Sequence, residues 1–225
     1  MEEKSVTNVE ENRIIASNLC YCYPEAQKNA VDDVSMRVKK GEFLAILGHN
    51  GSGKSTLVQH LNGLLKPTSG QVLVDGEDMN GENVDRRRIR QKVGLVFQYP
   101  EYQLFEETIA KDIAFGPKNQ GLSEEEIDQR VRRAMAHVHL DYDKYAERSP
   151  FDLSGGQMRR VAIAGVLAME PKVLILDDST SAVDTATDAK IREAMRTHIP
   201  GTTKIIIAQR ISSIQDADRV LVLDN

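Results

Sequence analysis

Short apolar runs recur along this chain, with longer stretches between them in which apolar residues have helical spacing. The runs cover residues 14–16, 43–47, 72–74, 93–97, 173–176, 205–208 and 220–223. Four of them (43–47, 173–176, 205–208 and 220–223) have the pattern of continuously buried strands, which predicts burial on both faces. Buried strands alternating with helices predict an α/β fold built on a mostly parallel sheet with both faces covered.

The segment 122–140 departs from this alternation. Ser123 and Glu126 have the spacing of a capping box, and Ile127, Val131 and Ala134 follow at helical spacing. The pattern predicts an amphipathic helix. Residues 99–165 are therefore predicted to form a mainly helical subdomain inserted into the α/β core, whereas the polar residues 1–12 are predicted to be disordered.

Composition and charge narrow the possible partners. The 225 residues carry a formal net charge of −5, so the surface as a whole does not indicate a nucleic-acid partner. A basic run at residues 86–92 leaves RNA or lipid contact open, but it contains no interleaved aromatic residue, which favours a solvated segment. No apolar stretch reaches the length of about 18 residues that a membrane span needs, and the acidic N-terminus does not resemble a secretory signal.

Two cysteines, Cys20 and Cys22, share one face of a predicted strand. A metal or redox site is conceivable there. Two small, half-buried thiols are the better interpretation.

Residues 48–55 match the pattern G-x-x-x-x-G-K-S. The match follows the predicted strand 43–47 and opens a predicted helix, which is the context that a phosphate-binding loop requires. Glycines let backbone N–H groups converge on phosphates, Lys54 is expected to reach the β- and γ-phosphates, and the Ser55 hydroxyl is expected to bind Mg²⁺. The predicted ATP contacts in this region are Gly48, His49, Asn50, Gly51, Ser52, Gly53, Lys54, Ser55 and Thr56.

An aspartate at the end of a buried strand usually completes such a site. Asp177 follows the run 173–176 directly. It is predicted to hold the hydration shell of Mg²⁺.

The sequence Leu153-Ser154-Gly155-Gly156-Gln157 lies between the phosphate loop and Asp177. With this order of motifs the chain resembles an ATPase subunit of an ATP-binding-cassette (ABC) transporter, over roughly residues 13–225. The resemblance implies a P-loop NTPase fold with an added antiparallel β subdomain, and a single domain in which residues 13–98 and 166–225 form the core. It also implies a head-to-tail dimer in which Ser154, Gly155, Gly156 and Gln157 contact the ATP held by the other subunit.

Three further positions match the family's motifs. Gln98 fits the Q-loop, with a role in catalysis and at Mg²⁺. Asp184 fits the D-loop, and Tyr23 lies where the family places an aromatic side chain that stacks on adenine.

The resemblance divides along the chain. Residues 13–170 resemble energy-coupling-factor ATPases of vitamin and cobalt importers. From residue 173 onward the chain resembles the degenerate ATPase half of a heterodimeric exporter, which suggests a natural or engineered chimera with a seam near 168–178. Against either family, the chain is expected to be truncated at its C-terminus.

Two positions depart from the family pattern. Asp178 replaces the glutamate that acts as general base, and Gln209 replaces the switch histidine. The aspartate is one methylene shorter, and a glutamine cannot change protonation state near neutral pH. Normal ATP binding and slow hydrolysis are therefore expected.

The sequence predicts an ATPase subunit that binds ATP and Mg²⁺ and powers transport of a solute across a membrane. Its expected partners are a second ABC ATPase, in a homodimer or heterodimer, and a transmembrane transporter subunit, with no nucleic acid and no membrane span of its own. Its expected location is cytoplasmic, on the inner face of the cell membrane. The alternative is a non-hydrolysing or engineered ATP-binding module without transport activity.

Overall fold

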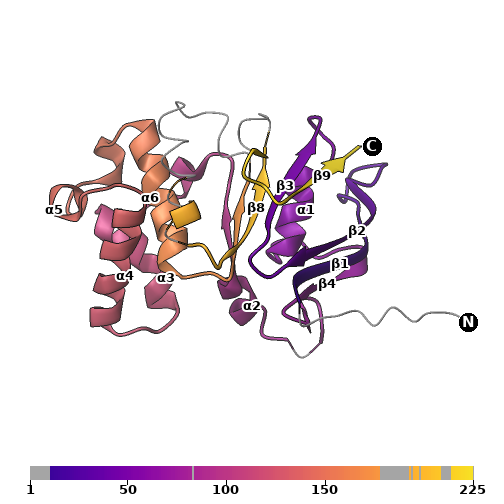
Figure 1. Ribbon diagram of the computed structural model, residues 1–225, viewed down its shortest axis with the longest axis horizontal. Coiled ribbons are helices and arrows are strands. Elements are labelled where there is room, and N and C mark those ends of the chain that lie inside the picture. The colour runs from indigo at the N-terminus through magenta and orange to yellow at the C-terminus, as the bar shows by residue number, and fades with distance from the viewer. Residues whose placement is uncertain are drawn as a thin grey trace, which may run out of the picture.

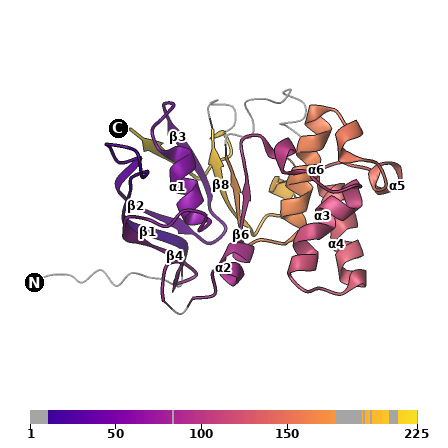
Figure 2. The same cartoon turned by 180° about the vertical axis from the view of Figure 1, so that it is seen from behind.

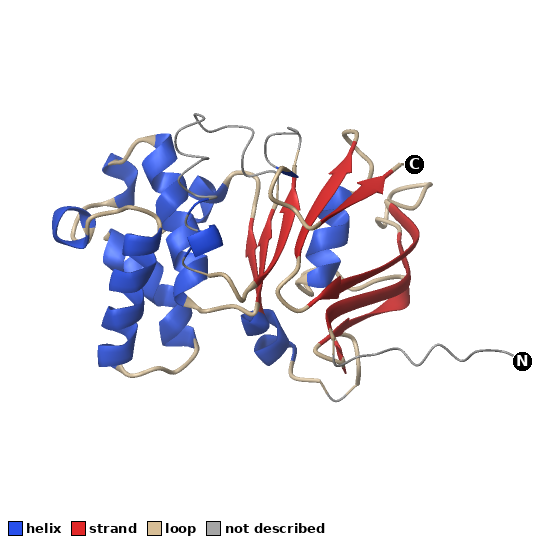
Figure 3. Cartoon of the chain, viewed as in Figure 1, coloured by secondary structure: helices blue, strands red, loops and turns tan. Residues whose placement is uncertain are grey.

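The computed structural model describes residues 11–82, 84–177, 193, 195–197, 199–208 and 214–224. Within these ranges the chain forms two sheets and a group of helices (Figures 1 and 3). The predicted α/β architecture, with an antiparallel β part and a helical part, is confirmed.

The larger sheet is parallel and has the order β6-β7-β8-β3-β9. Its strands are β3 (Phe43–Gly48), β6 (Val93–Val96), β7 (Val173–Leu176), β8 (Thr203–Ile207) and β9 (Arg219–Leu223). Every residue of β6, β7 and β8 is buried. The smaller sheet has the order β2-β1-β4-β5 and is antiparallel. It consists of β1 (Asn12–Tyr21), β2 (Val31–Lys39), β4 (Ser69–Val74) and β5 (Glu77–Asp78).

The helices occupy two places (Figure 2). Helix α1 (Lys54–Leu61) lies between the two sheets and shares a buried core with both, and α2 (Arg86–Lys92) precedes β6. On the other side of the parallel sheet lie α3 (Ile109–Asn119), α4 (Glu124–His137), α5 (Tyr142–Tyr145) and α6 (Gly155–Ala168), with short 3₁₀ turns at Pro100–Gln103 and Pro150–Asp152. A second core joins these helices to the sheet.

The helix predicted from the Ser123–Glu126 pattern is α4. The Ser123 hydroxyl accepts a hydrogen bond from the Glu126 backbone N–H at 3.3 Å, and Ile127, Val131 and Ala134 are buried. Helix α6 runs across residue 165 and packs on both α3 and α4. It therefore connects the helical part to the β7 strand that follows it.

One strand prediction is wrong. Residues 220–223 do form a strand, but β9 is not buried, since Val220 and Val222 are 43% and 64% exposed. Among the described residues β9 pairs only with β3, so it lies at an edge of the sheet. Val220 and Val222 are exposed there, whereas Leu221 and Leu223 pack partly buried against the core. Conversely, β6 is fully buried although a glycine interrupts its apolar run.

Within the described ranges, no helix combines the length and hydrophobicity that crossing a membrane requires.

Candidate nucleotide-binding site

The phosphate loop is shaped by two close backbone approaches. Gly53, the N-cap of α1, has φ of 85°, and a Cβ atom there would lie 2.1 Å from the Ala30 carbonyl oxygen. A Cβ atom at Gly48 would lie 2.5 Å from the Leu223 carbonyl oxygen. Only glycine fits at these positions, so the loop stays close to the sheet and its N–H groups gather at the start of α1.

Lys54 is almost fully buried and turns back over its own loop. Its Nζ donates to the carbonyl oxygens of Gly48 at 2.9 Å and His49 at 2.8 Å. Both acceptors are neutral, and an anionic phosphate oxygen makes a stronger partner for an ammonium group. The lysine is thus held beside the loop where phosphates would arrive.

Ser55 and Asp177 meet across 122 residues of sequence. The Ser55 hydroxyl donates to Asp177 Oδ1 at 3.1 Å. Asp177 is 4% exposed and its backbone N–H donates to the Val96 carbonyl, which joins the ends of β6 and β7. Parallel strands place their carboxyl ends at one edge of the sheet, and this edge carries the hydroxyl and carboxylate that Mg²⁺ prefers.

Lys54, Ser55 and Asp177 line a cavity of about 490 Å³. Its lining includes the predicted residues Tyr23, Asn50, Gly51, Gly53, Lys54, Ser55, Thr56, Gln98 and Asp177. Ala30 and Ile207 also line it and were missed by the sequence analysis. Neither carries a chemical signal: Ala30 contributes a backbone carbonyl, and Ile207 ends a buried strand.

Tyr23 follows β1 and is 41% exposed. Its hydroxyl lies 3.2 Å from Thr56 Oγ1, in the first turn of α1. The structure therefore brings the predicted adenine-stacking residue to the phosphate loop, although 33 residues separate the two in sequence.

Ser154, Gly155, Gly156 and Gln157, here called the signature segment, open α6. The Ser154 and Gln157 side chains form a capping box, and Gln157 Nε2 donates to the Tyr145 hydroxyl at 3.2 Å. None of the four is among the residues that line the phosphate cavity. The space around Gly155 is open, because a Cβ atom there would meet nothing within 4 Å.

Three predicted site residues, Asp178, Asp184 and Gln209, lie outside the described residues. Their predicted roles stay predictions.

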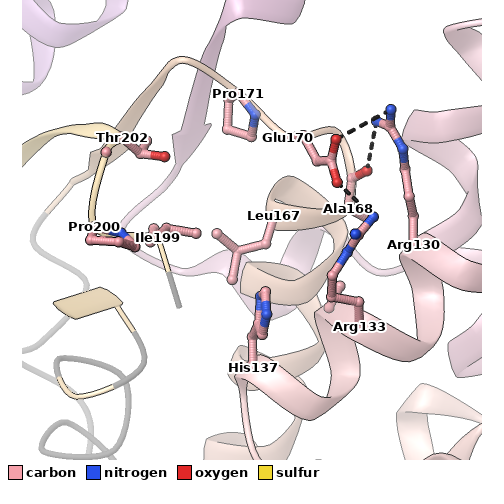
Figure 4. A pocket seen from close by; sticks show the side chains of 12 residues that line it. Arg130, Arg133, His137, Leu167, Ala168, Glu170, Pro171, Ile199, Pro200 and Thr202 are labelled. Carbon is pink, nitrogen blue, oxygen red and sulfur yellow. Dashed lines mark hydrogen bonds and ion pairs between the residues drawn. The ribbon is translucent and has the colours of Figure 1, made fainter. Parts of the chain in front are cut away.

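A second cavity, of about 370 Å³, lies between α4, the end of α6 and residues 199–202 (Figure 4). Its two arginines are already paired. The Glu170 carboxylate accepts from Arg133 at 2.7 Å and from Arg130 at 3.3 Å, and Arg130 also contacts Glu126 at 2.8 Å. This cavity is an ion-paired junction between helices, unlike the phosphate cavity, where Lys54 contacts neutral carbonyls.

The strand–loop–helix, the Ser55–Asp177 pair and the separate signature segment define an ATP-binding P-loop ATPase of the cassette type. The family model for ABC transporters matches residues 31–181. The chain therefore belongs to the ABC transporter family.

Individual relatives agree with this assignment. The energy-coupling factor transporter ATP-binding protein EcfA2 of Clostridium tetani is 56% identical over 214 residues, which cover 92% of this chain and 74% of the relative. Its counterpart from Clostridium perfringens is 53% identical over 206 residues, covering 88% and 71%. Because the first match covers 92% of the chain, it continues past residue 173, beyond the suggested seam.

Solved structures also match. The cbiO1 protein from Clostridium perfringens, part of the ABC transporter complex cbiONQ, has a TM-score of 0.82 and 37% identity, covering 95% of this chain and 85% of its own. The ATP-binding cassette MJ0796, as a post-hydrolysis dimer bound to ADP and Pi, has a TM-score of 0.82 and 29% identity, covering 94% of each chain.

Proposed function

We propose that this chain is the ATP-binding subunit of an energy-coupling factor transporter, and that it binds MgATP between two subunits and hydrolyses it slowly. The observation that carries the proposal is the assembly of Lys54, Ser55 and Asp177 at one edge of the sheet. The high identity to proteins named as energy-coupling factor transporter ATP-binding proteins supports the choice of transporter class.

The phosphate loop fits the nucleotide that the family implies. The buried Ser52 hydroxyl has no hydrogen-bond partner among the described residues, so a phosphate oxygen could supply one. Lys54 and the loop N–H groups would hold the β- and γ-phosphates. Tyr23 would stack on adenine.

The donor set also fits Mg²⁺. Ser55, Gln98 and Asp177 offer oxygen ligands or partners for bound water around one end of the cavity. When bound there, Mg²⁺ neutralises charge on the phosphate oxygens and polarises them. The protein's own part is to orient: Asp177, held through its backbone by β6, keeps the Ser55 hydroxyl aimed at the phosphate end.

The signature segment supports a head-to-tail dimer. It lies apart from the chain's own phosphate cavity and is open to solvent at Gly155. In the proposed dimer, the N-terminal end of α6 from one subunit covers the ATP of the other, where its N–H groups favour phosphate charge. The partner is a second copy of this chain or a related ATPase.

The transmembrane partner would contact the exposed aromatic side chains next to Gln98. Tyr99, Tyr102 and Phe105 are 51%, 84% and 57% exposed, and Phe105 packs edge-on against the exposed Phe115 at 4.9 Å. Exposed apolar side chains gathered in one place are typical of interaction sites. The proposed location is therefore the inner face of the cell membrane, bound to a membrane-spanning subunit.

Slow hydrolysis follows from Asp178 and Gln209. A positioned acid–base group contributes about 10²–10⁴-fold in rate. We expect the double variant Asp178→Glu/Gln209→His to raise the rate of phosphate release by at least about 10-fold, with ATP affinity changed by less than about 3-fold. Steady-state phosphate release and equilibrium ATP binding measure the two. A double variant no faster than the parent contradicts this account of the two positions.

A second candidate, an ATP-binding module that hardly hydrolyses, rests on the same two substitutions. Size-exclusion chromatography with ATP and Mg²⁺, run beside the phosphate-release assay, separates the two. A dimer that persists with little phosphate supports the module, whereas release that accompanies dimer dissociation supports the transporter ATPase.

A further inference from the structure

Tyr23, the tyrosine that is proposed to hold the base, contacts Tyr21 and Thr56, and each of these two contacts His60. The rings of Tyr21 and Tyr23 meet edge to face, with centroids 4.9 Å apart and planes at 83°. The Tyr21 ring also meets His60, with centroids 4.8 Å apart and planes at 67°. Tyr23, Tyr21 and His60 thus form a row of rings, here called the aromatic row, from the cavity edge to the core.

Thr56 contacts both ends of the aromatic row, Tyr23 and His60. Its side-chain hydroxyl lies 3.2 Å from the Tyr23 hydroxyl, and its backbone carbonyl lies 2.7 Å from His60 Nδ1. Because a carbonyl oxygen only accepts, Nδ1 carries the proton. Through Thr56, the three rings are therefore connected to the first turn of α1, the helix that follows the phosphate loop.

The two ends of the aromatic row differ in burial. His60 is 1% exposed, whereas Tyr23 is 41% exposed. Tyr21 lies at the end of β1, and its carbonyl accepts from the Ala30 N–H at 2.8 Å, which closes the segment that carries Tyr23. An exposed side chain on a connecting segment samples several rotamers unless its neighbours restrict it.

We propose that Tyr21 is a positioning residue for nucleotide binding: it fixes the Tyr23 ring in the orientation that accepts the adenine base. This inference rests on the proposed function, since it assumes that Tyr23 stacks on the base. An edge-to-face contact engages at most one face of the Tyr23 ring, and Tyr23 remains 41% exposed and lines the phosphate cavity, which leaves it accessible to a base. A restricted ring loses less conformational entropy when the nucleotide binds.

The test compares ATP with inorganic tripolyphosphate, which has the phosphates and lacks the base. Tyr21→Leu removes the ring and keeps an apolar side chain. We expect it to weaken MgATP binding by about 3- to 10-fold, the scale of one aromatic pair. Tripolyphosphate binding in the presence of Mg²⁺ should change by less than about 2-fold. Isothermal titration calorimetry on the full chain gives both affinities.

Tyr21→Phe is the matched control. It keeps the ring and removes only the hydroxyl, so ATP affinity should stay within about 2-fold of the parent. Tyr21→Met, with an unbranched side chain that fills irregular space, replaces Tyr21→Leu if the leucine variant does not fold. Loss of tripolyphosphate affinity in both ring-less variants would show a merely structural role and overturn the proposal.

The variant Tyr23→Leu tests the positioning role of Tyr21 separately from the proposed stacking of adenine on Tyr23. If Tyr23→Leu leaves the ATP affinity unchanged, the base platform itself is wrong. If Tyr23→Leu weakens ATP binding and Tyr21→Leu does not, the platform stands and the positioning role of Tyr21 falls. If both weaken it, the double variant should be no weaker than Tyr23→Leu alone, because a positioning residue has nothing left to position.

Discussion

His60 is a buried histidine close to the nucleotide site. Burial lowers its pKa below 6.5, although its hydrogen bond to the Thr56 carbonyl acts in the opposite direction. The folded protein therefore holds His60 neutral at pH values where the unfolded chain binds a proton. Stability from this group is complete above pH 6.5 and falls as the pH drops below it.

Replacing His60 should reduce the acid sensitivity of the fold. One proton accounts for at most about 1.4 kcal/mol of unfolding free energy per pH unit. We expect His60→Phe, which keeps an aromatic ring beside Tyr21, to remove that slope between pH 6.5 and pH 5. Urea unfolding at several pH values measures it. His139→Asn is the control, because His139 is exposed and has φ of 55°, which asparagine tolerates; an equal effect in both variants contradicts the assignment to His60.

The residues of the nucleotide site differ in how well the sequence predicts them. Lys54, Ser55 and Asp177 could be predicted because their motifs fix both residue type and the preceding strand. Tyr21 and Ala30 could not, since their roles come from a ring contact and a backbone carbonyl. No sequence spacing encodes either contact.

Glu170 connects two elements, α4 and the end of α6. It follows the C-cap Met169 and has φ of 51°, a left-handed conformation in which glycine is normally preferred. Its carboxylate bridges Arg130 and Arg133 of α4 (Figure 4). The two ion pairs offset the conformational cost at this position.

Two variants at Glu170 should separate charge from conformation. Glu170→Asn removes the ion pairs and keeps a residue that tolerates this backbone, and it should lower the free energy of unfolding by about 0.5–1 kcal/mol. Glu170→Gly also removes the pairs but relieves the backbone, so it should lie within about 0.5 kcal/mol of the parent. Urea denaturation measures both. Equal losses in the two variants would mean that glycine relieves this backbone position no more than asparagine does.

Elements with strong periodicity were the most predictable. Helix α4 follows from its capping-box pattern and apolar spacing. The strand β2 was not predicted, because it contains no run of apolar residues. The apolar content of β9 predicted burial, but burial depends on what covers a strand as well as on its sequence. Sheet order, which decides the neighbours, is a long-range property.

At the scale of the whole molecule, α6 connects two distant regions. Its N-terminal end carries the signature segment, and its C-terminal end borders the second cavity, which Glu170 lines. A helix of 14 residues separates these ends by about 20 Å. Changes at one end can therefore be made without altering the other.

This separation allows a direct test of the head-to-tail dimer. Gly155 is helical, and a side chain there meets nothing within 4 Å in the single chain. We expect Gly155→Arg to fold normally and to keep its affinity for ATP within about 3-fold, because the phosphate cavity is untouched. The ATP-dependent dimer should weaken by at least about 10-fold, since the new side chain would occupy the space that the other subunit's nucleotide needs.

Gly201→Arg is the matched control for that variant. A side chain at Gly201 also meets nothing within 4 Å, but Gly201 lines the cavity at the other end of α6. In the presence of ATP and Mg²⁺, the Gly201→Arg variant should form a dimer as the parent does, measured by size-exclusion chromatography with light scattering. A Gly155→Arg variant that dimerises as well as Gly201→Arg would place the dimer contact elsewhere. In that case the phosphate cavity would not be completed by the signature segment of a second subunit.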